Sequence, residues 1–307
     1  LGISKSNVDF FNENILNIKK FLWNINKIEI YSENLKNEKI LNFENNKEPL
    51  FSIIRNVDLY NSLLFHLKKN RLVRIKKKID QDSLLKTDYK LIFNCDYDHS
   101  VSKKFFYKKM RKNYNSFAYV TTFKHQKLLN NQVASQIFTK KGPLAFLPIS
   151  PSETSVVYSA ADKKDINFKD LIKRYNTKYE IIKVNKFLTF ELKSSNLRSY
   201  FHKNIIAFGD LLHKIHPLAG QGFNMTIRDI KEIKDLIDSK KKHGLDLDTS
   251  ICLDFEKNTR SKNYFFLNGI DFIHEFFAFE NKINNNTLSK VVKLLGKNKI
   301  ANKFFTK

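Results

Sequence analysis

Apolar positions recur at helical spacing near both ends of the chain. In residues 6–23 and again in residues 54–69 they lie three or four positions apart, the spacing of a helix with one buried face. From Leu253 onward the chain again has Phe-rich apolar faces of helical character, followed by a basic tail. We therefore expect helices in these three regions.

The pattern changes between Asn115 and Val157. Four short runs rich in β-branched and aromatic residues are separated by polar turns, which predicts an antiparallel sheet; they are SFAYVTTF, QVASQIFT, GPLAFLPI and TSVVYSA. Two other apolar runs, YKLIFNCD and KNIIAFGD, end in Asp96 and Asp210 and predict buried parallel strands, whose carboxyl ends are where ligands bind in open α/β sheets. Asp96 could bind a sugar hydroxyl or cap a loop, and both interpretations stay open.

Glycine is rare, with 8 residues among 307, yet Gly209, Gly220 and Gly222 lie close together. Residues 223–237 have helical apolar spacing, so Gly220 and Gly222 fall at a helix N-terminus. Unpaired N–H groups there face outward, and glycine lets a flat or anionic group come close, while Pro217 stiffens the approach. From the residues alone, a ligand-contacting turn and a tightly packed turn are equally good interpretations.

Charge and composition limit the kinds of molecule that this protein is expected to bind. The formal charge is +24, but the excess is Lys spread from end to end without a basic stripe or a nucleic-acid motif, so we expect no nucleic-acid partner. Two distant cysteines and the histidines at 213 and 216 complete no metal set, and both histidines are expected to be structural. The apolar stretch at 264–279 falls short of the ~18 uninterrupted apolar residues of a spanning helix. A cytoplasmic protein with weak attraction to anionic membranes is expected.

The segment GDLLHKIHPLAGQGFNMTIRD, residues 209–229, resembles the second FAD-binding motif of the aromatic-ring flavoprotein monooxygenases. Its His-Pro followed by AGQGFN resembles the ubiquinone-biosynthesis hydroxylases in particular. LGISKSN, DYKLIFNCDYDHSVSKK, SQIFTKKGPLAFLP and LDFEKNTRSKN resemble further segments of that family. The resemblance implies an α/β fold: an FAD-binding Rossmann-like domain with an inserted antiparallel-sheet substrate domain and C-terminal helices.

The same resemblance implies the cofactor and the reaction. FAD would be reduced by NAD(P)H, would react with O2, and would hydroxylate the aromatic ring of a polyprenyl phenol. Asp210 would bind the ribityl and pyrophosphate region, and the isoalloxazine would lie against the start of the helix after the glycines. No catalytic base is identified. The implied cofactor-binding residues are Gly209, Asp210, Pro217, Ala219, Gly220, Gln221, Gly222, Phe223, Asn224 and Asp96.

The chain departs from the family at several places. No GxGxxG occurs, and the resemblance therefore implies that the first βαβ unit, of roughly 30 or more residues, is missing. We expect that unit to precede LGISKSN in a longer chain, and the 307 residues alone to be inactive. In the motifs, five larger or altered side chains replace family residues: Tyr97 (for Gly), Lys103 (for Arg), Leu211 and Leu212 (for small residues) and Thr226 (for Gly). These changes are expected to bear on how closely a cofactor packs.

The resemblance also suggests domains, partners and alternatives. Expected partners are the hydrophobic prenylated phenol, the inner face of a membrane approached from the cytoplasm, and other ubiquinone-biosynthesis proteins. The basic tail, residues 288–305, is either an interfacial helix or an ordinary helix packed on the core. The alternatives are a degenerate, non-catalytic scaffold and another flavin enzyme of the same fold, such as a reductase. The expected divisions are residues 1–104 (partial FAD-binding domain with substrate-domain segments), 105–197 (substrate domain), 198–250 (second FAD motif) and 251–307 (C-terminal helices).

Overall fold

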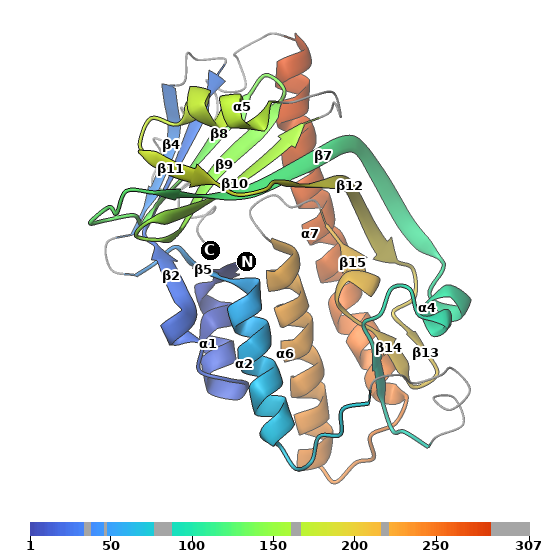
Figure 1. The fold of residues 1–307 in the computed structure, drawn as a ribbon. Helices are drawn as coiled ribbons and strands as arrows, with labels where there is room; N and C mark the ends of the chain where they lie inside the picture. The colour runs from blue at the N-terminus through green and yellow to red at the C-terminus, as the bar shows by residue number, and fades with distance from the viewer. Residues whose placement is uncertain (34–37, 46–47, 77–87, 161–166, 216–220, 284–307) are drawn as a thin grey trace.

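The structure is a computed structural model, and it describes most of the chain. Backbone is described for residues 1–33, 38–45, 48–76, 88–160, 167–215 and 221–283, with side chains of the last helix described up to residue 269. Figure 1 shows a large twisted sheet above a layer of helices, with two small sheets between them and at the side. The layered α/β arrangement agrees with the fold class expected from the sequence.

The large sheet has the strand order β15-β12-β7-β10-β9-β8-β3-β4, and β11 also pairs with β7. All of its pairings are antiparallel except β3 with β8. The antiparallel sheet predicted between residues 115 and 157 is confirmed by four consecutive strands. The strands are β3 (Lys27–Ser32), β4 (Glu38–Glu44), β7 (Lys109–His125), β8 (Val133–Thr139), β9 (Gly142–Ser150), β10 (Glu153–Ala160), β11 (Ile181–Val184), β12 (Leu188–Leu197) and β15 (His213–Lys214).

Helix α5 (Phe168–Tyr175) covers one face of this sheet (Figure 1). Its buried Phe168 and Ile172 pack with Phe123 and Tyr158 from the strands. Aromatic side chains fill this interface, because the broad gap between a helix and a twisted sheet needs large side chains to exclude water.

A second sheet, of strand order β1-β5-β2, is antiparallel and packs on helices. Its strands are β1 (Gly2–Ser4), β2 (Leu22–Ile25) and β5 (Phe51–Ile54). Buried side chains of β1, β5 and α1 (Lys5–Asn14) form one cluster with Ile227 of α6 (Gln221–Lys242). The N-terminus of the chain is therefore packed against a helix more than 200 positions away in sequence.

Helix α1 is shorter than the sequence predicted. The expected helix over residues 6–23 ends at Asn14, and the chain continues as a 3-10 turn (Lys19–Phe21) and then β2. Asn12 accepts the backbone N–H of Ile18 at 2.8 Å, and Asn14 donates to Phe10 at 3.0 Å. Asparagine side chains that bond nearby backbone compete with the helical ladder, which accounts for the early end.

Helix α2 (Asn56–Lys69) forms where it was predicted, but it does not bury the expected face. Val57 and Tyr60 are 59% and 61% exposed, whereas Leu59 is buried in the cluster of β1, β5 and α1. The apolar spacing identified the helix correctly. The side of the helix that is covered depends on the neighbouring β1-β5-β2 sheet.

The third sheet has the order β13-β14-β6, from Phe201–His202, Ile205–Ala207 and Ile92–Asn94. β14 and β6 are parallel, which confirms the prediction for the two apolar runs. β14 is fully buried, while Phe93 of β6 is 44% exposed. Between β6 and β7 lies the short helix α4 (Ser100–Phe105). The long helices α6 and α7 (Ser250–Ile283) pack side by side and confirm the helices predicted there (Figure 1).

Candidate functional site

The carboxyl ends of β6 and β14 form one edge of the small parallel sheet. Asn94 is in register with Ala207, and the N–H of Phe208 donates to the carbonyl oxygen of Asn94 at 2.9 Å. Asp96 and Asp210 each follow their strand by a few residues. The structure thus brings these two predicted residues to the same edge of the sheet, where ligands of open α/β sheets bind.

Gly209 opens the short 3-10 turn Gly209–Leu211 with a φ of +59°. That left-handed conformation is rarely adopted by residues other than glycine, and among the described residues no heavy atom beyond its chain neighbours lies within 4 Å of the place a Cβ would occupy. Conformation, and not crowding, therefore requires glycine here.

Asp210 is exposed in this turn, and within the described part of the chain its carboxylate makes no hydrogen bond or ion pair. The next two residues, Leu211 and Leu212, are fully buried in the core with Phe208 and Phe255. The leucines that replace small family residues therefore point into the protein. They leave the exposed side of the turn clear for a ligand.

Asp96 caps its own loop. Its Oδ1 accepts the N–H groups of Asp98 at 2.9 Å and His99 at 3.2 Å, just before α4. The hydroxyl of Ser102 donates to the backbone carbonyl of Asp96. The loop-capping interpretation from the sequence is therefore realised, and a cofactor-binding role for Asp96 stays a prediction. Tyr97, which stands where the family has glycine, is 46% exposed at this edge.

The start of α6 lies beneath the large sheet and beside the N-terminus, and α6 contacts the Gly209–Leu211 turn (Figure 1). Gln221, Gly222 and Phe223 are half-buried there. N–H groups in the first turn of a helix have no partner within the helix and carry its positive dipole end. A Cβ on Gly222 would stand 3.5 Å from Ile215, an ordinary contact, so packing alone does not demand glycine at 222. The predicted residues Pro217, Ala219 and Gly220, with His216, lie outside the described residues.

Asn224 joins the start of α6 to the N-terminal strand. Its Oδ1 accepts from the N–H of Ser4 at 2.9 Å and from Nδ2 of Asn7 at 2.8 Å, and its Nδ2 donates to the carbonyl of Gly2 at 3.0 Å. The side chain is 5% exposed. Since the amide is already bonded to β1 and α1, Asn224 would shape a cofactor site by fixing these elements and through its backbone.

His213 is the first residue of β15, and its side chain is completely buried against the two long helices. Its Nε2 bonds Oδ2 of Asp229 in α6, and Nδ2 of Asn263 in α7 donates to the other carboxylate oxygen at 3.2 Å. The structural role expected for His213 is confirmed. Sequence reasoning missed Asp229 and Asn263; the available signal was an acidic residue between Ile227 and Ile230 on an otherwise apolar helix face.

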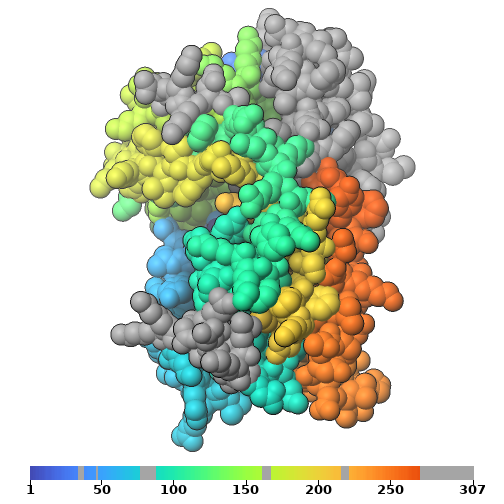
Figure 2. Space-filling view, turned by 90° about the vertical axis from the view of Figure 1, so that its right-hand side faces the viewer, coloured from blue at the N-terminus to red at the C-terminus, as the bar shows by residue number. Residues whose placement is uncertain are grey.

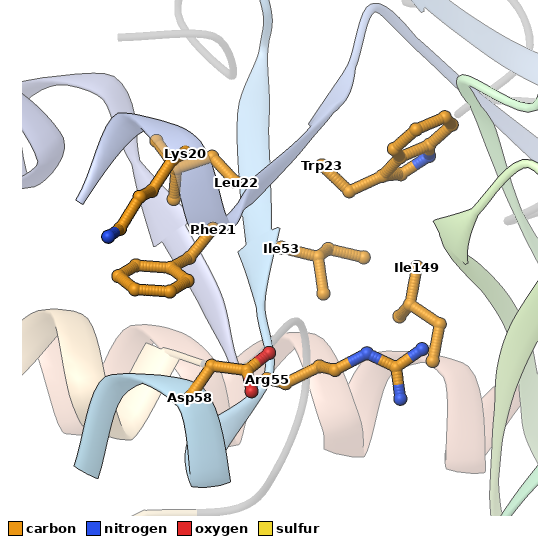
Figure 3. A pocket seen from close by; sticks show the side chains of 8 residues that line it. All are labelled: Lys20, Phe21, Leu22, Trp23, Ile53, Arg55, Asp58 and Ile149. Carbon is orange, nitrogen blue, oxygen red and sulfur yellow. The ribbon is translucent and has the colours of Figure 1, made fainter. Parts of the chain in front are cut away.

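A separate surface pocket of about 200 Å³ lies between the β1-β5-β2 sheet and β9 (Figure 3). Trp23, Ile53 and Ile149 form its apolar part, and Arg55 crosses it to pair with Glu153 at 2.5 Å. None of the described residues predicted to bind the cofactor lines this pocket. It is therefore distinct from the edge formed by β6, β14 and the start of α6.

The residues present at that edge fit a flavin nucleotide. An exposed carboxylate suits hydroxyl groups, and the positive end of α6 suits an electron-rich ring edge. The arrangement can bind and orient a cofactor. Its exposed thiol, Cys95 directly after β6, has a pKa that burial raises, which disfavours the nucleophilic thiolate.

Comparisons with known proteins give two kinds of likeness. The mitochondrial ubiquinone biosynthesis monooxygenase COQ6 of Schizosaccharomyces pombe is 27% identical, in an alignment covering 63% of this chain and 51% of that protein. The 3-demethoxyubiquinol 3-hydroxylase of Escherichia coli is 28% identical, over 36% of this chain and 30% of the enzyme. The chain spans about half the length, or less, of these curated relatives. No protein-family profile matches.

Solved structures match over nearly the whole chain. The p-nitrophenol 4-monooxygenase PnpA of Pseudomonas putida superposes with a TM-score of 0.75 at 13% identity, covering 99% of this chain and 86% of that one. HpxO of Klebsiella pneumoniae, solved with FAD and uric acid, gives 0.74 at 10% identity, covering 99% and 85%. The chain is thus a sequence relative of the ubiquinone-biosynthesis monooxygenases, and it has the fold of the FAD-dependent aromatic monooxygenases.

Proposed function

We propose that this chain belongs to an FAD-dependent monooxygenase that hydroxylates the aromatic ring of a polyprenyl phenol in ubiquinone biosynthesis, using NAD(P)H and O2. One observation carries the proposal. The segment that resembles the FAD motif combines an exposed Asp210, shortly after the parallel strand β14, with helix α6, which contacts the Gly209–Leu211 turn and begins next to Ile215. The sequence relatives act in ubiquinone biosynthesis, and a neighbour of the same fold was solved with FAD.

The described residues have definite tasks in this proposal. The carboxylate of Asp210 accepts hydrogen bonds from ribityl hydroxyls, because it is exposed and has no other partner among the described residues. The N–H groups of Gln221, Gly222 and Phe223 would hold the isoalloxazine ring, and the positive end of the helix would favour negative charge on it. FAD, when bound, supplies the redox and oxygen-transfer chemistry. Pro217, Ala219 and Gly220 are proposed to contact the same ring.

The protein's own contribution is orientation and exclusion of water. The large sheet covers the start of α6 from above, and residues 105–197, which form most of it, are proposed to bind the substrate (Figure 1). Residues 198–250, with parts of 1–104, are proposed to bind FAD, and 251–307 to support them. Holding the phenol ring close to the flavin in a dry site raises the rate by proximity and protects the reactive oxygen species from water.

A polyprenyl phenol resides in a membrane, so the enzyme must meet it at the surface. Among the described residues, no helix has the length and apolar character needed to cross a membrane. The net charge of +24 attracts the protein to anionic lipid surfaces, which supports a peripheral position. The basic tail at 288–305 lies outside the described residues. Other ubiquinone-biosynthesis proteins are proposed as further partners at this surface.

Flavin binding and turnover test the proposal directly. The complete protein is titrated with FAD while flavin fluorescence is recorded, and NAD(P)H-dependent hydroxylation of a polyprenyl phenol is then followed by mass spectrometry. We expect FAD binding that weakens about tenfold in Asp210→Ala, the loss of one or two hydrogen bonds to a charged group. Asp246→Ala, which removes an exposed carboxylate from another loop, is the matched control. Absence of FAD binding by the complete protein would leave the non-catalytic scaffold as the better interpretation.

A further inference from the structure

Lys109, the first residue of β7, lies at the edge where β6 and β14 end. Its Nζ is 3.5 Å from the carbonyl oxygen of Leu211, the residue after Asp210, and 3.9 Å from the ring centroid of Tyr97, the residue after Asp96. The side chain is half-buried. Its ammonium group therefore stands between the two loops that carry the carboxylates of this edge.

Lys109 has no carboxylate partner within the described part of the chain. Its neighbours there are a carbonyl oxygen, an aromatic face and another cation, Arg111, and burial together with the Arg111 charge lowers the pKa of Lys109 to about 8. Of the carboxylates at this edge, Asp96 is engaged in loop capping, and Asp210 makes no ion pair among the described residues. Leaving a half-buried ammonium group without a counter-ion is costly, and a bound anion would offset that cost.

Strand register places two more cations on the same face of the sheet. Lys109 lies opposite Leu197, and Arg111 lies opposite Ser195, which on its other side is opposite Lys214. Side chains directly opposite each other, or two positions apart along a strand, share one face of a sheet. Neither Arg111 nor Lys214 forms an ion pair within the described ranges, so a row of three cations faces one side of this edge. In Figure 2, the segment containing the start of β7 lies beside the yellow segment of β12 to β15.

We propose that Lys109, supported by Arg111 and Lys214, binds the diphosphate of a dinucleotide at this edge. A diphosphate carries two negative charges and presents acceptor oxygens to three separate donors, which matches a row of cations better than a single carboxylate would. Its placement beside Asp210 also suits a dinucleotide, whose hydroxyl groups adjoin the diphosphate. The inference rests on the proposed function, since FAD and NAD(P)H both contain a diphosphate.

Binding of ligands with and without the diphosphate tests this assignment. Dissociation constants of FAD, riboflavin, NADH and NADPH are measured by fluorescence and calorimetry for the complete protein, Lys109→Met and Lys109→Arg. The matched control is Lys108→Met, which removes one exposed positive charge at the neighbouring position. We expect Lys109→Met to weaken one dinucleotide about tenfold, with riboflavin unchanged and Lys109→Arg retaining most of the affinity.

The four ligands show which dinucleotide supplies the diphosphate, and they distinguish failure of this inference from failure of the proposed function. Weakening of FAD alone assigns the diphosphate to the flavin, and weakening of NADH or NADPH alone assigns it to the reductant. If FAD binds normally to Lys109→Met and so do both nicotinamides, the inference is overturned while the proposed function stands. If the unaltered protein binds no dinucleotide, the proposed function fails, and protection of Lys109 from acetylation by inorganic pyrophosphate then decides the inference. Equal labelling with and without pyrophosphate would overturn it.

Discussion

The contact between Asn224 and the N-terminal segment is the most informative interaction to remove. Asn224→Ala deletes three side-chain hydrogen bonds, to Ser4, Asn7 and Gly2, and these tie β1 and α1 to the first turn of α6. Asn7 keeps a bond of 3.2 Å to the backbone carbonyl of residue 224. The N–H of Ser4 and the carbonyl of Gly2 lose a partner in a half-buried position.

The expected loss follows from counting these groups. Each intramolecular hydrogen bond contributes about 1 kcal/mol net, so three bonds amount to about 3 kcal/mol. Leaving two half-buried backbone groups unpaired adds to this, although water can reach them in part, and we expect a total of about 3–4 kcal/mol. A domain has a free energy of unfolding of about 5–15 kcal/mol, so the variant remains folded and measurable.

Urea unfolding followed by circular dichroism measures the change in the free energy of unfolding. The matched control is Asn258→Ala, which removes one exposed bond of 2.8 Å between α7 and Glu232, and it should cost less than about 1 kcal/mol. A loss in Asn224→Ala no larger than in this control would refute the reasoning, because it would mean that the amide does not hold β1 on α6. FAD affinity should fall in parallel if β1 helps to position the start of α6.

Three further predictions concern other positions. Gly142 has a φ of +143°, and a Cβ there would stand 1.9 Å from the carbonyl oxygen of Ser159, so Gly142→Ala should destabilise the protein by at least about 2 kcal/mol. Gly269→Ala, within helix α7, should instead stabilise it by up to about 1 kcal/mol. Urea unfolding of both variants distinguishes strain at Gly142 from a general effect of losing a glycine. His213→Leu leaves a buried carboxylate without its histidine partner and should cost about 3–5 kcal/mol, and a neutral outcome in the same assay would show that the pair contributes little. The pKa of Lys109 is lowered in the folded state from 10.5 to about 8, so between these pH values the unfolded state binds more protons than the folded state. The contribution of Lys109 to the free energy of unfolding should therefore rise as the pH increases from about 8 to 10.5. Acetylation at pH 8 should also modify Lys109 faster than an exposed lysine, and equal rates would contradict the lowered pKa.

Local patterns were sufficient for elements whose partners lie nearby in the sequence. The antiparallel strands between residues 115 and 157 and the helix after the glycines were predicted from spacing alone. The parallel pairing of β6 and β14 was also predicted, because each is a short apolar run ending in a carboxylate. The sequence motif around Gly209 further identified which segment resembles an FAD-binding site.

Other features depend on partners that a local pattern does not contain. Periodicity shows that a helix has an apolar face, but only the neighbouring sheet decides which side is covered, as α2 demonstrates with Leu59 buried and Tyr60 exposed. The parallel contact of β3 with β8 spans about a hundred positions. Such contacts arise where long chain segments meet and bury surface together, and no short window of sequence records that meeting.

What the sequence determined by itself is therefore the antiparallel strands between residues 115 and 157, the two parallel strands, the helices α2, α6 and α7, and the segment that resembles a flavin motif. What only the tertiary structure decided is which side chains meet. It joined Asn224 to Ser4 across 220 positions, paired His213 with Asp229, and set Lys109 between two loops at one sheet edge. The physical reason is that secondary structure follows from local backbone and side-chain preferences, whereas a site forms from the burial and pairing of groups that are distant in the chain.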